Sequence, residues 1–260
     1  MECTRLACGV LLSGVIGSTA LAQPEPVDNY FPDRLSGWRF ELEPFGLLPV
    51  DIDGTIQVGD RQVPFNADLG DVFDRLDFAL NGRFEAWKQR WGIILNGQHY
   101  WLGSEFTTPD GMTTFEHNTR IGVGSALIAR RFGAYDINDR VSFSVDAEAG
   151  VWLGRIHSTL EMSDGFSRTQ NEIFPKAMLV ARPILRITPS WAVINRNSIT
   201  MPDISWMVML GAEYDWRFLA FELGYFAERI VLAKDVVTLA ADAHGPYLGV
   251  AFRWGSGRPY

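Results

Sequence analysis

Side chains able to perform acid–base or nucleophilic chemistry are sparse in this sequence. Its four histidines are His99, His117, His157 and His244. No two of them have the spacing of a metal site with each other or with carboxylates. The adjacent His157 and Ser158, with Glu161 nearby, suggest a Ser/His hydrolase, but consecutive residues of an extended strand point to opposite faces. That pair would meet only if the chain bends there, so we predict no catalytic site, no metal and no cofactor.

The first 22 residues have the composition of a secretory signal peptide. Arg5 precedes an apolar centre over 9–16, and a small-residue cleavage pattern follows at 20–22; a membrane anchor is the alternative. Both cysteines, Cys3 and Cys8, lie in this segment, so we expect a mature chain without disulfides. Hydrogen-bonded ladders of a closed barrel would provide the cohesion that disulfides give other exported proteins.

The stretch 244–254 alternates with a period of two, which is typical of a strand with two different faces. The residues of one face are apolar, namely Leu248, Val250, Phe252 and Trp254. The residues of the other face are small or charged, namely Gly249, Ala251 and Arg253. Comparable alternation recurs over 38–43, 78–86, 91–103, 113–131, 141–153, 176–187, 191–200 (more weakly), 205–215 and 219–228. We expect short turns at 88–90, 132–140, 188–190 and 215–217, and longer loops at 104–112, 158–173 and 234–243. This pattern predicts an all-β fold, an antiparallel transmembrane β-barrel of about ten strands, with eight or twelve as alternatives.

Composition agrees with a barrel in the outer membrane of a Gram-negative bacterium. Hydrophobic residues make up 47% of the chain and aromatic residues 13%, yet the mature part has no apolar run of about 20 residues, as a membrane helix would require. The net charge of −8 argues against nucleic-acid binding.

Charged residues are phased opposite the apolar faces, which places them in the bore. On the lipid side a Lys or Arg at the bilayer midplane would cost about 2–4 kcal/mol, whereas opposite charges inside can pair and fill the lumen. We expect Arg253 to lie beside Glu41 and Glu43 where the ring closes. The predicted lumen charges are Arg39, Glu41, Glu43, Arg83, Glu85, Glu116, Arg120, Asp146, Glu148, Lys176, Arg182, Arg186, Glu213, Glu222, Glu228 and Arg253.

Residues 50–77 depart from the alternation. A hairpin is expected around Gly59-Asp60, with Pro64 confining its second arm to a sheet edge. A short helix follows, because Leu69, Val72, Phe73 and Leu76 share one helical face and Asp68 can cap its start. We predict that this insert either plugs or covers the barrel, or is an ordinary ordered loop.

Three motifs resemble an uncharacterised family of proteobacterial outer-membrane β-barrel proteins. They are Ile52-Asp-Gly-Thr-Ile-Gln-Val58, Leu76-Asp-Phe-Ala-Leu-Asn-Gly-Arg-Phe-Glu-Ala86 with Arg90-Trp-Gly92, and the final Gly245-Pro-Tyr-Leu-Gly-Val-Ala-Phe-Arg-Trp254. The resemblance implies a fold and a location but no reaction. It also implies an assembly signal at Tyr247, Phe252 and Trp254, although the chain continues past Trp254 to Tyr260.

The expected organisation is a signal peptide (1–22), a periplasmic lead-in (23–36), a barrel (37–254) and a C-terminal tail (255–260). The expected partners are outer-membrane lipid or lipopolysaccharide, the barrel-assembly machinery and periplasmic chaperones; the oligomeric state is open. Since about eight strands leave an interior just filled by side chains, the leading hypothesis is a largely closed lumen with a structural or interaction role in the envelope. A narrow diffusion channel and an outer-leaflet lipid-modifying enzyme are the alternatives.

Overall fold

The computed structural model describes residues 37–58, 61–107, 114–137, 141–162, 167–234 and 237–255. The predicted signal peptide, lead-in and nearly all of the predicted tail lie outside these ranges. The elements are β1 (Trp38–Leu47), β2 (Asp51–Val58), β3 (Arg61–Asp68), α1 (Leu69–Arg75), β4 (Leu76–Lys88), β5 (Trp91–Thr107), β6 (Thr114–Asp136), β7 (Ser142–Met162), β8 (Ser167–Thr188), β9 (Trp191–Met201), β10 (Ser205–Trp216), β11 (Leu219–Lys234) and β12 (Val237–Gly255).

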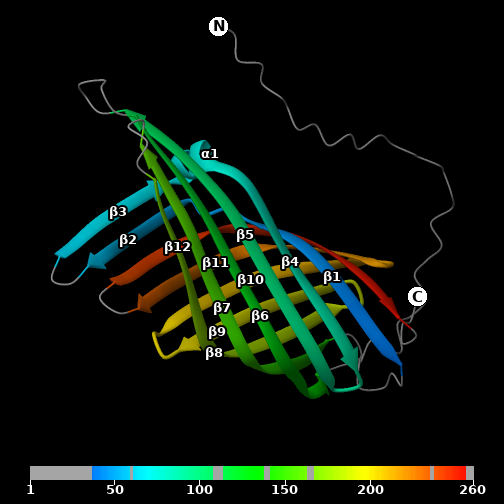
Figure 1. Cartoon of the computed structure of the whole chain (residues 1–260). Coiled ribbons are helices and arrows are strands. Elements are labelled where there is room, and N and C mark those ends of the chain that lie inside the picture. Colours follow the sequence, from blue (N-terminus) through cyan, green and yellow to red (C-terminus); the bar gives the residue numbers. More distant parts are fainter. Residues whose placement is uncertain are drawn as a thin grey trace, which may run out of the picture.

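Ten of the strands close into an antiparallel ring (Figure 1). The order is β1-β4-β5-β6-β7-β8-β9-β10-β11-β12, and β12 pairs back onto β1. Across this closing seam Glu41 lies opposite Arg253 and Phe40 opposite Trp254. The ten-strand prediction is confirmed, as is the prediction that the closing stretch pairs with residues 38–43.

The last strand is paired along one edge by two different segments. Its second half, Tyr247–Gly255, pairs with β1, and its first half, Val237–His244, pairs with β2. The backbone amides of Leu48 and Val50 continue the ladder through the break between β1 and β2. The β2–β3 hairpin therefore prolongs the barrel wall beyond β1 (Figure 1).

The predicted edge position of Pro64 and the predicted helix are both confirmed. β3 is the last strand of the sheet, and Pro64 lies opposite Thr55 of β2. Helix α1 begins directly after Asp68, whose carboxylate accepts a hydrogen bond from the Asp71 amide at 2.9 Å; the Asp71 carboxylate accepts one from the Asp68 amide at 3.3 Å. This reciprocal cap satisfies donors at the helix start, and α1 packs against β3 and β5 at the rim. No helix in the described ranges is long and apolar enough to cross a membrane.

Strands run further than the sequence predicted at one rim. Residues 104–107 pair with 114–117, residues 158–161 pair with 167–170, and residues 237–243 pair with β11. The loop expected at 158–173 is thus largely strand, residues 237–243 of the loop expected at 234–243 belong to β12, and residues 104–107 of the loop expected at 104–112 belong to β5. Polar composition suggested loops there, but strands that project beyond the bilayer into water need no apolar face.

The outer surface carries an apolar band bounded at one rim by aromatic side chains. Leu80, Ile128, Leu210, Leu223 and Leu248 are among its exposed members. Aromatic residues border the short turns, with Trp38, Trp91, Trp191, Trp216, Phe218 and Trp254 all exposed at strand ends or in a turn. Such a band with an interfacial aromatic girdle is the surface that a bilayer requires of a spanning barrel.

Candidate functional site

The charged residues of the bore gather into three ion-pair clusters in the half nearer the short turns. Most charges predicted to point inward are buried, which confirms the phasing of β1, β4, β7, β8, β10, β11 and β12. Burial demands partners, because an unpaired charge in a low-dielectric interior costs several kcal/mol.

The Arg182 cluster comprises Arg182, Glu85, Asp146 and Arg131. The Arg182 guanidinium donates to both Glu85 oxygens, at 2.6 and 2.9 Å, and to Asp146 Oδ2 at 2.8 Å. Arg131 donates to both Asp146 oxygens, at 2.6 and 2.7 Å. The indole of Trp87 donates to Glu85 at 2.6 Å and lies 4.9 Å below the Arg131 guanidinium. Bidentate, charge-assisted bonds of this kind fix the geometry of both partners.

The Arg196 cluster comprises Arg196, Glu222, Glu43 and Tyr247. Arg196 donates to the two Glu222 oxygens at 2.9 and 2.8 Å, and Glu43 lies 3.7 Å away. The Tyr247 hydroxyl donates to Glu222. Arg196 was missed by the sequence prediction because Ala192 and Ile194 precede it on the same inward face, so β9 shows mixed faces. The polar run Arg196, Ser198 and Thr200, two residues apart, could have revealed it.

The Arg253 cluster lies at the seam and comprises Arg253, Glu41, Glu213, Asp215 and Arg186. Arg253 Nε donates to Glu41 Oε2 at 2.6 Å, and its other nitrogens pair with Glu213, at 2.5 Å, and with Asp215. Arg186 donates to Asp215 Oδ2 at 2.7 Å. The predicted pairing of Arg253 with Glu41 is confirmed, whereas Glu43 forms an ion pair with Arg196 instead.

Together the three clusters form what we call the charge layer. Among the described residues, every strand of the ring except β5 contributes at least one side chain to the charge layer. Strand β5 instead supplies Ile94, which is fully buried beside Trp87. Arg39 shares the inward parity of Glu41 on β1 and lies opposite Trp87. Ion pairs between side chains of different strands therefore span the whole width of the bore.

Tyr247 lies inside the barrel, on the face opposite Phe252 and Trp254. Its ring crosses the directly paired Gly211 and Gly224, where a Cβ on either glycine would overlap it. Only 1% of Tyr247 is exposed, while Phe252 and Trp254 face outward. Of the three residues assigned to an assembly signal, two thus share the outer surface, and the signal itself stays a prediction.

Arg120 is the predicted lumen charge that the structure places elsewhere. Residues of odd number point inward on β6, where Leu127, Ala129 and Arg131 are buried. Arg120 has the opposite parity, is exposed and lies beside Trp101 and His157 in the ladder. The prediction is wrong because the outer face of β6 carries small residues. The larger apolar residues of this strand, which the prediction placed toward lipid, point into the bore. The side chain of Glu116 lies outside the described part of the chain.

Apolar side chains fill much of the bore beyond the charge layer. Trp152, Met178 and Leu232 are buried there, with Ile156 and Phe174 packed against them. Near the turn between β9 and β10, Lys176 of β8 donates hydrogen bonds to two backbone carbonyls. One is that of Asp203 in the turn, at 2.7 Å, and the other is that of Val231 of β11. Its ammonium also lies 5.7 Å from the Trp152 ring. The predicted charge-filled lumen is therefore charged in one half and largely apolar in the other.

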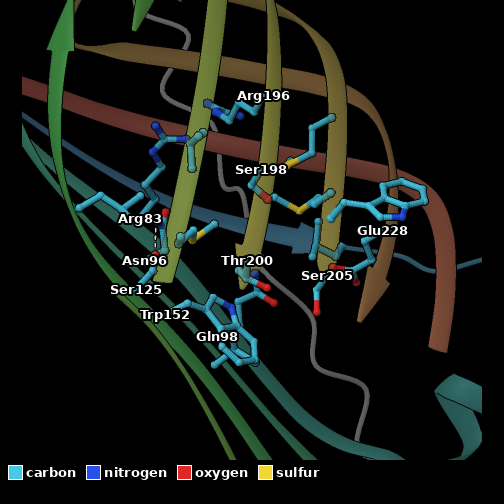
Figure 2. A pocket seen from close by; sticks show the side chains of 18 of the residues that line it. Arg83, Asn96, Gln98, Ser125, Trp152, Arg196, Ser198, Thr200, Ser205 and Glu228 are labelled. Atoms are coloured by element: carbon cyan, nitrogen blue, oxygen red, sulfur yellow. Dashed lines mark hydrogen bonds between the residues drawn. The ribbon is translucent and has the colours of Figure 1, made fainter. Parts of the chain in front are cut away.

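A cavity of about 120 Å³ lies between these two halves (Figure 2). Its polar lining includes Arg83, Glu148, Arg196, Thr200 and Glu228, and its apolar lining includes Leu127, Val180, Met178 and Met209. Five buried polar atoms of these side chains have no hydrogen-bond partner, namely Arg83 Nε, Arg83 Nη2, Glu148 Oε1, Arg196 Nε and Thr200 Oγ1. Arg83 Nε and Glu85 Oε1, 2.6 Å apart, form an ion pair without hydrogen-bond geometry.

Three of the histidines, His99, His157 and His244, lie on the outer wall rather than in the bore, and the side chain of His117 lies outside the described part of the chain. His99 meets the Trp101 ring edge-on at 5.1 Å, and His244 Nδ1 lies 2.6 Å from the Tyr225 hydroxyl. His157 and Ser158 are consecutive residues of β7 opposite Asn171 and Gln170, so strand alternation directs them to opposite faces. The described residues contain no group of three or more potential metal ligands.

A closed antiparallel ring of ten strands, an apolar outer band and a charged interior define a class of protein. The chain is an outer-membrane β-barrel protein, whose place is the outer membrane of a Gram-negative bacterium.

No family model matches the chain, and no characterised protein matches it in sequence. Among solved structures it is similar to the outer membrane protease OmpT of Escherichia coli, at 9% identity and a TM-score of 0.43, covering 85% of this chain and 98% of that one. It is also similar to Ail, the attachment invasion locus protein of Yersinia pestis, crystallised with the heparin analogue sucrose octasulfate. There the identity is 10% and the TM-score 0.38, covering 85% of this chain and all of that one. The toluene transporter TodX of P. putida is similar at 9% identity and a TM-score of 0.26, covering 90% and 94%.

Proposed function

We propose that this protein is a non-conducting outer-membrane barrel that serves the envelope through its wall and its rims. The observation that carries the proposal is the charge layer. Arg182, Arg196 and Arg253 each pair with carboxylates from strands elsewhere in the ring; Arg182 and Arg196 are buried, and 14% of the Arg253 side chain is exposed. Ions and small solutes crossing the lumen would have to break these buried pairs.

The size of the ring supports the same proposal. About eight strands give a barrel whose interior side chains just fill it, while 16–18 strands leave a water channel. Ten strands lie near the filled end, and Trp87, Ile94 and Trp152 add bulk to the bore. The remaining cavity is bounded on one side by the charge layer. The open rims and the β2–β3 hairpin are then the parts available for contact with other envelope components.

Release of solutes from vesicles tests this proposal. Liposomes loaded with a small fluorescent dye and carrying the refolded protein should retain the dye as well as protein-free liposomes do. A porin reconstituted at equal density provides the positive control. Rapid, protein-dependent release would reject the closed lumen and favour the narrow diffusion channel.

We also propose the finer assignment suggested by the sequence motifs. The chain would belong to the uncharacterised proteobacterial outer-membrane barrel family, with Phe252 and Trp254 as the aromatic residues that the barrel-assembly machinery recognises. Its outward apolar band would contact outer-membrane lipid and lipopolysaccharide, and periplasmic chaperones would carry the unfolded chain. Alanine substitution of Phe252 and Trp254 together should reduce the amount of folded protein in the outer membrane. Unchanged amounts would remove these residues from that role.

A further inference from the structure

The cavity between the charge layer and the apolar half of the bore has more polar groups than its protein contacts satisfy. Arg83, Glu148, Arg196 and Thr200 are each more than nine-tenths buried, and each has an atom without a hydrogen-bond partner. Buried polar atoms left unpaired are costly, so such atoms around a cavity indicate an occupant that pairs with them.

Water alone is a poor occupant of this space. An ordered internal water can pair with the polar groups of the lining, but it leaves the apolar wall of Leu127, Val180, Met178 and Met209 without a matching partner. A molecule with a polar group at each end and an apolar middle would satisfy both kinds of lining. The volume of about 120 Å³ is comparable to that of a cavity that binds benzene, so the molecule would have roughly six to nine non-hydrogen atoms.

The charges around the cavity favour a cation. Carboxylates and guanidiniums of the Arg182 cluster balance each other, and Glu222 pairs with Arg196 at 2.8 Å. The Lys176 ammonium is held by the carbonyls of Asp203 and Val231 and lies 3.3 Å from Ser205 Oγ. Among the remaining lining charges, Glu43 and Glu148 lie 3.7 Å from Arg196 and Arg83. Glu228 is the lining carboxylate for which the described residues provide no ion pair. An ammonium group beside Glu228 would supply the missing charge.

The opposite side of the cavity favours a hydroxyl. Figure 2 shows Arg83 and Arg196 on one side of the cavity and Glu228 with Ser205 on the other. Arg83 Nη2 and Glu148 Oε1 form an ion pair at 3.7 Å, and Glu148 Oε1 lies equally far from Arg182 Nε, but neither Arg83 Nη2 nor Glu148 Oε1 has a hydrogen-bond partner. A hydroxyl can accept from the first and donate to the second.

We propose that this cavity binds a small organic cation that carries a hydroxyl group, of the amino-alcohol class. The ammonium lies at Glu228, the hydroxyl at Arg83 and Glu148, and the carbon chain along the methionines. The charge layer closes the side nearer the short turns, so a ligand would enter from the other rim, past the apolar side chains of that half. This inference goes beyond the proposed closed lumen and does not depend on it, since a conducting barrel could also hold the cation.

Calorimetric titration of the refolded protein in detergent with aminohexanol tests the site. Three probes isolate the groups: hexylamine lacks the hydroxyl, hexanol lacks the charge, and caproate reverses it. We expect aminohexanol to bind about tenfold or more tightly than hexanol, by the usual contribution of a hydrogen bond to a charged group. Hexylamine should be intermediate, and caproate should not bind.

The Glu228→Gln variant separates a binding role from a structural one. It should abolish the preference for aminohexanol over hexanol, and it should fold at least as stably as the wild type because a carboxylate without an ion pair is removed. Thr200→Val should weaken the binding of aminohexanol moderately. Asp53→Asn, which also removes one carboxylate but on the exposed β2–β3 hairpin, and Thr159→Val are the matched controls and should leave binding unchanged.

Several outcomes would overturn the proposal. Absence of saturable heat with every probe would do so, as would equal binding of hexanol and aminohexanol. A Glu228→Gln variant that binds aminohexanol like the wild type, or that is markedly less stable, would assign Glu228 to structure instead. A crystal structure grown with aminohexanol that holds only water in the cavity would have the same consequence.

Discussion

Arg253 and Glu41 face each other directly across the seam where the last strand meets the first, with Arg253 Nε 2.6 Å from Glu41 Oε2. They are the 253rd and 41st residues of the chain, so their pair forms only when the ring closes. Removing one partner of a buried pair leaves the other uncompensated. The seam is thus held by side-chain charges in the bore as well as by the backbone ladder.

Substituting Arg253→Gln should lower the free energy of unfolding by about 2 kcal/mol, less than the cost of breaking a fully buried pair, because 14% of the Arg253 side chain and 15% of the Glu41 side chain are exposed. Urea titration in detergent micelles, followed by tryptophan fluorescence, measures it. Arg229→Gln is the matched control, because Arg229 pairs with Asp242 on the exposed rim; it should cost no more than about 1 kcal/mol. Equal effects of the two substitutions would show that the seam pair contributes no more than a surface pair.

Strand number and most faces could be predicted because alternation is imposed by the bilayer. Glu41, Asp146, Glu213 and Arg253 were placed correctly, since a charge on the lipid side is too costly. The rule failed on β6, where Leu127 packs inward against Ile94 and the outer parity carries Gly122, Gly124 and Ala126. Apolar residues mark the lipid face only where the interior is polar, and half of this interior is apolar.

The site depended on pairings between distant strands, which alternation does not specify. Nothing local indicates that Arg182 of β8 joins Glu85 of β4 to Asp146 of β7. The local sequence pattern also could not predict the break between β1 and β2, because both segments pair with the same edge of β12. Register across the ring follows from the closed geometry as a whole.

Gly224→Ala should destabilise the barrel. An added Cβ would overlap the Tyr247 ring and the backbone of β10, and overpacking of this kind costs about 1–3 kcal/mol. Gly97→Ala is the control, because a Cβ there meets no atom within 4 Å, and it should change the free energy of unfolding by less than about 0.5 kcal/mol. The same urea titration compares the two. Tolerance of alanine at Gly224 would mean that Tyr247 does not lie across this glycine pair.

Leu223→Arg should impair insertion of the barrel into the membrane. Leu223 is 62% exposed on the outer apolar band, where an arginine costs about 2–4 kcal/mol near the midplane. Refolding yield into lipid vesicles, scored by heat-modifiable migration on gels, should fall. Gln57→Arg on the exposed hairpin is the control and should refold normally. A normal yield for Leu223→Arg would place this part of β11 outside the bilayer.

Asp68→Ala should loosen α1 without affecting the barrel. The Asp68 carboxylate caps the helix start, and loss of such a cap costs about 1 kcal/mol. Hydrogen exchange should quicken at the amides of 71–75 and stay unchanged in β11. Unaltered exchange over 71–75 would show that packing against β3 and β5, rather than the cap, holds the helix.

Planar-bilayer recording tests the closed lumen most directly. The refolded wild-type protein should give no steady conductance steps above the protein-free membrane, because the charge layer of the Arg182, Arg196 and Arg253 clusters crosses the bore. Insertion is verified on the same sample by heat-modifiable gel migration. Reproducible conductance steps of uniform size from the wild-type protein would contradict the account.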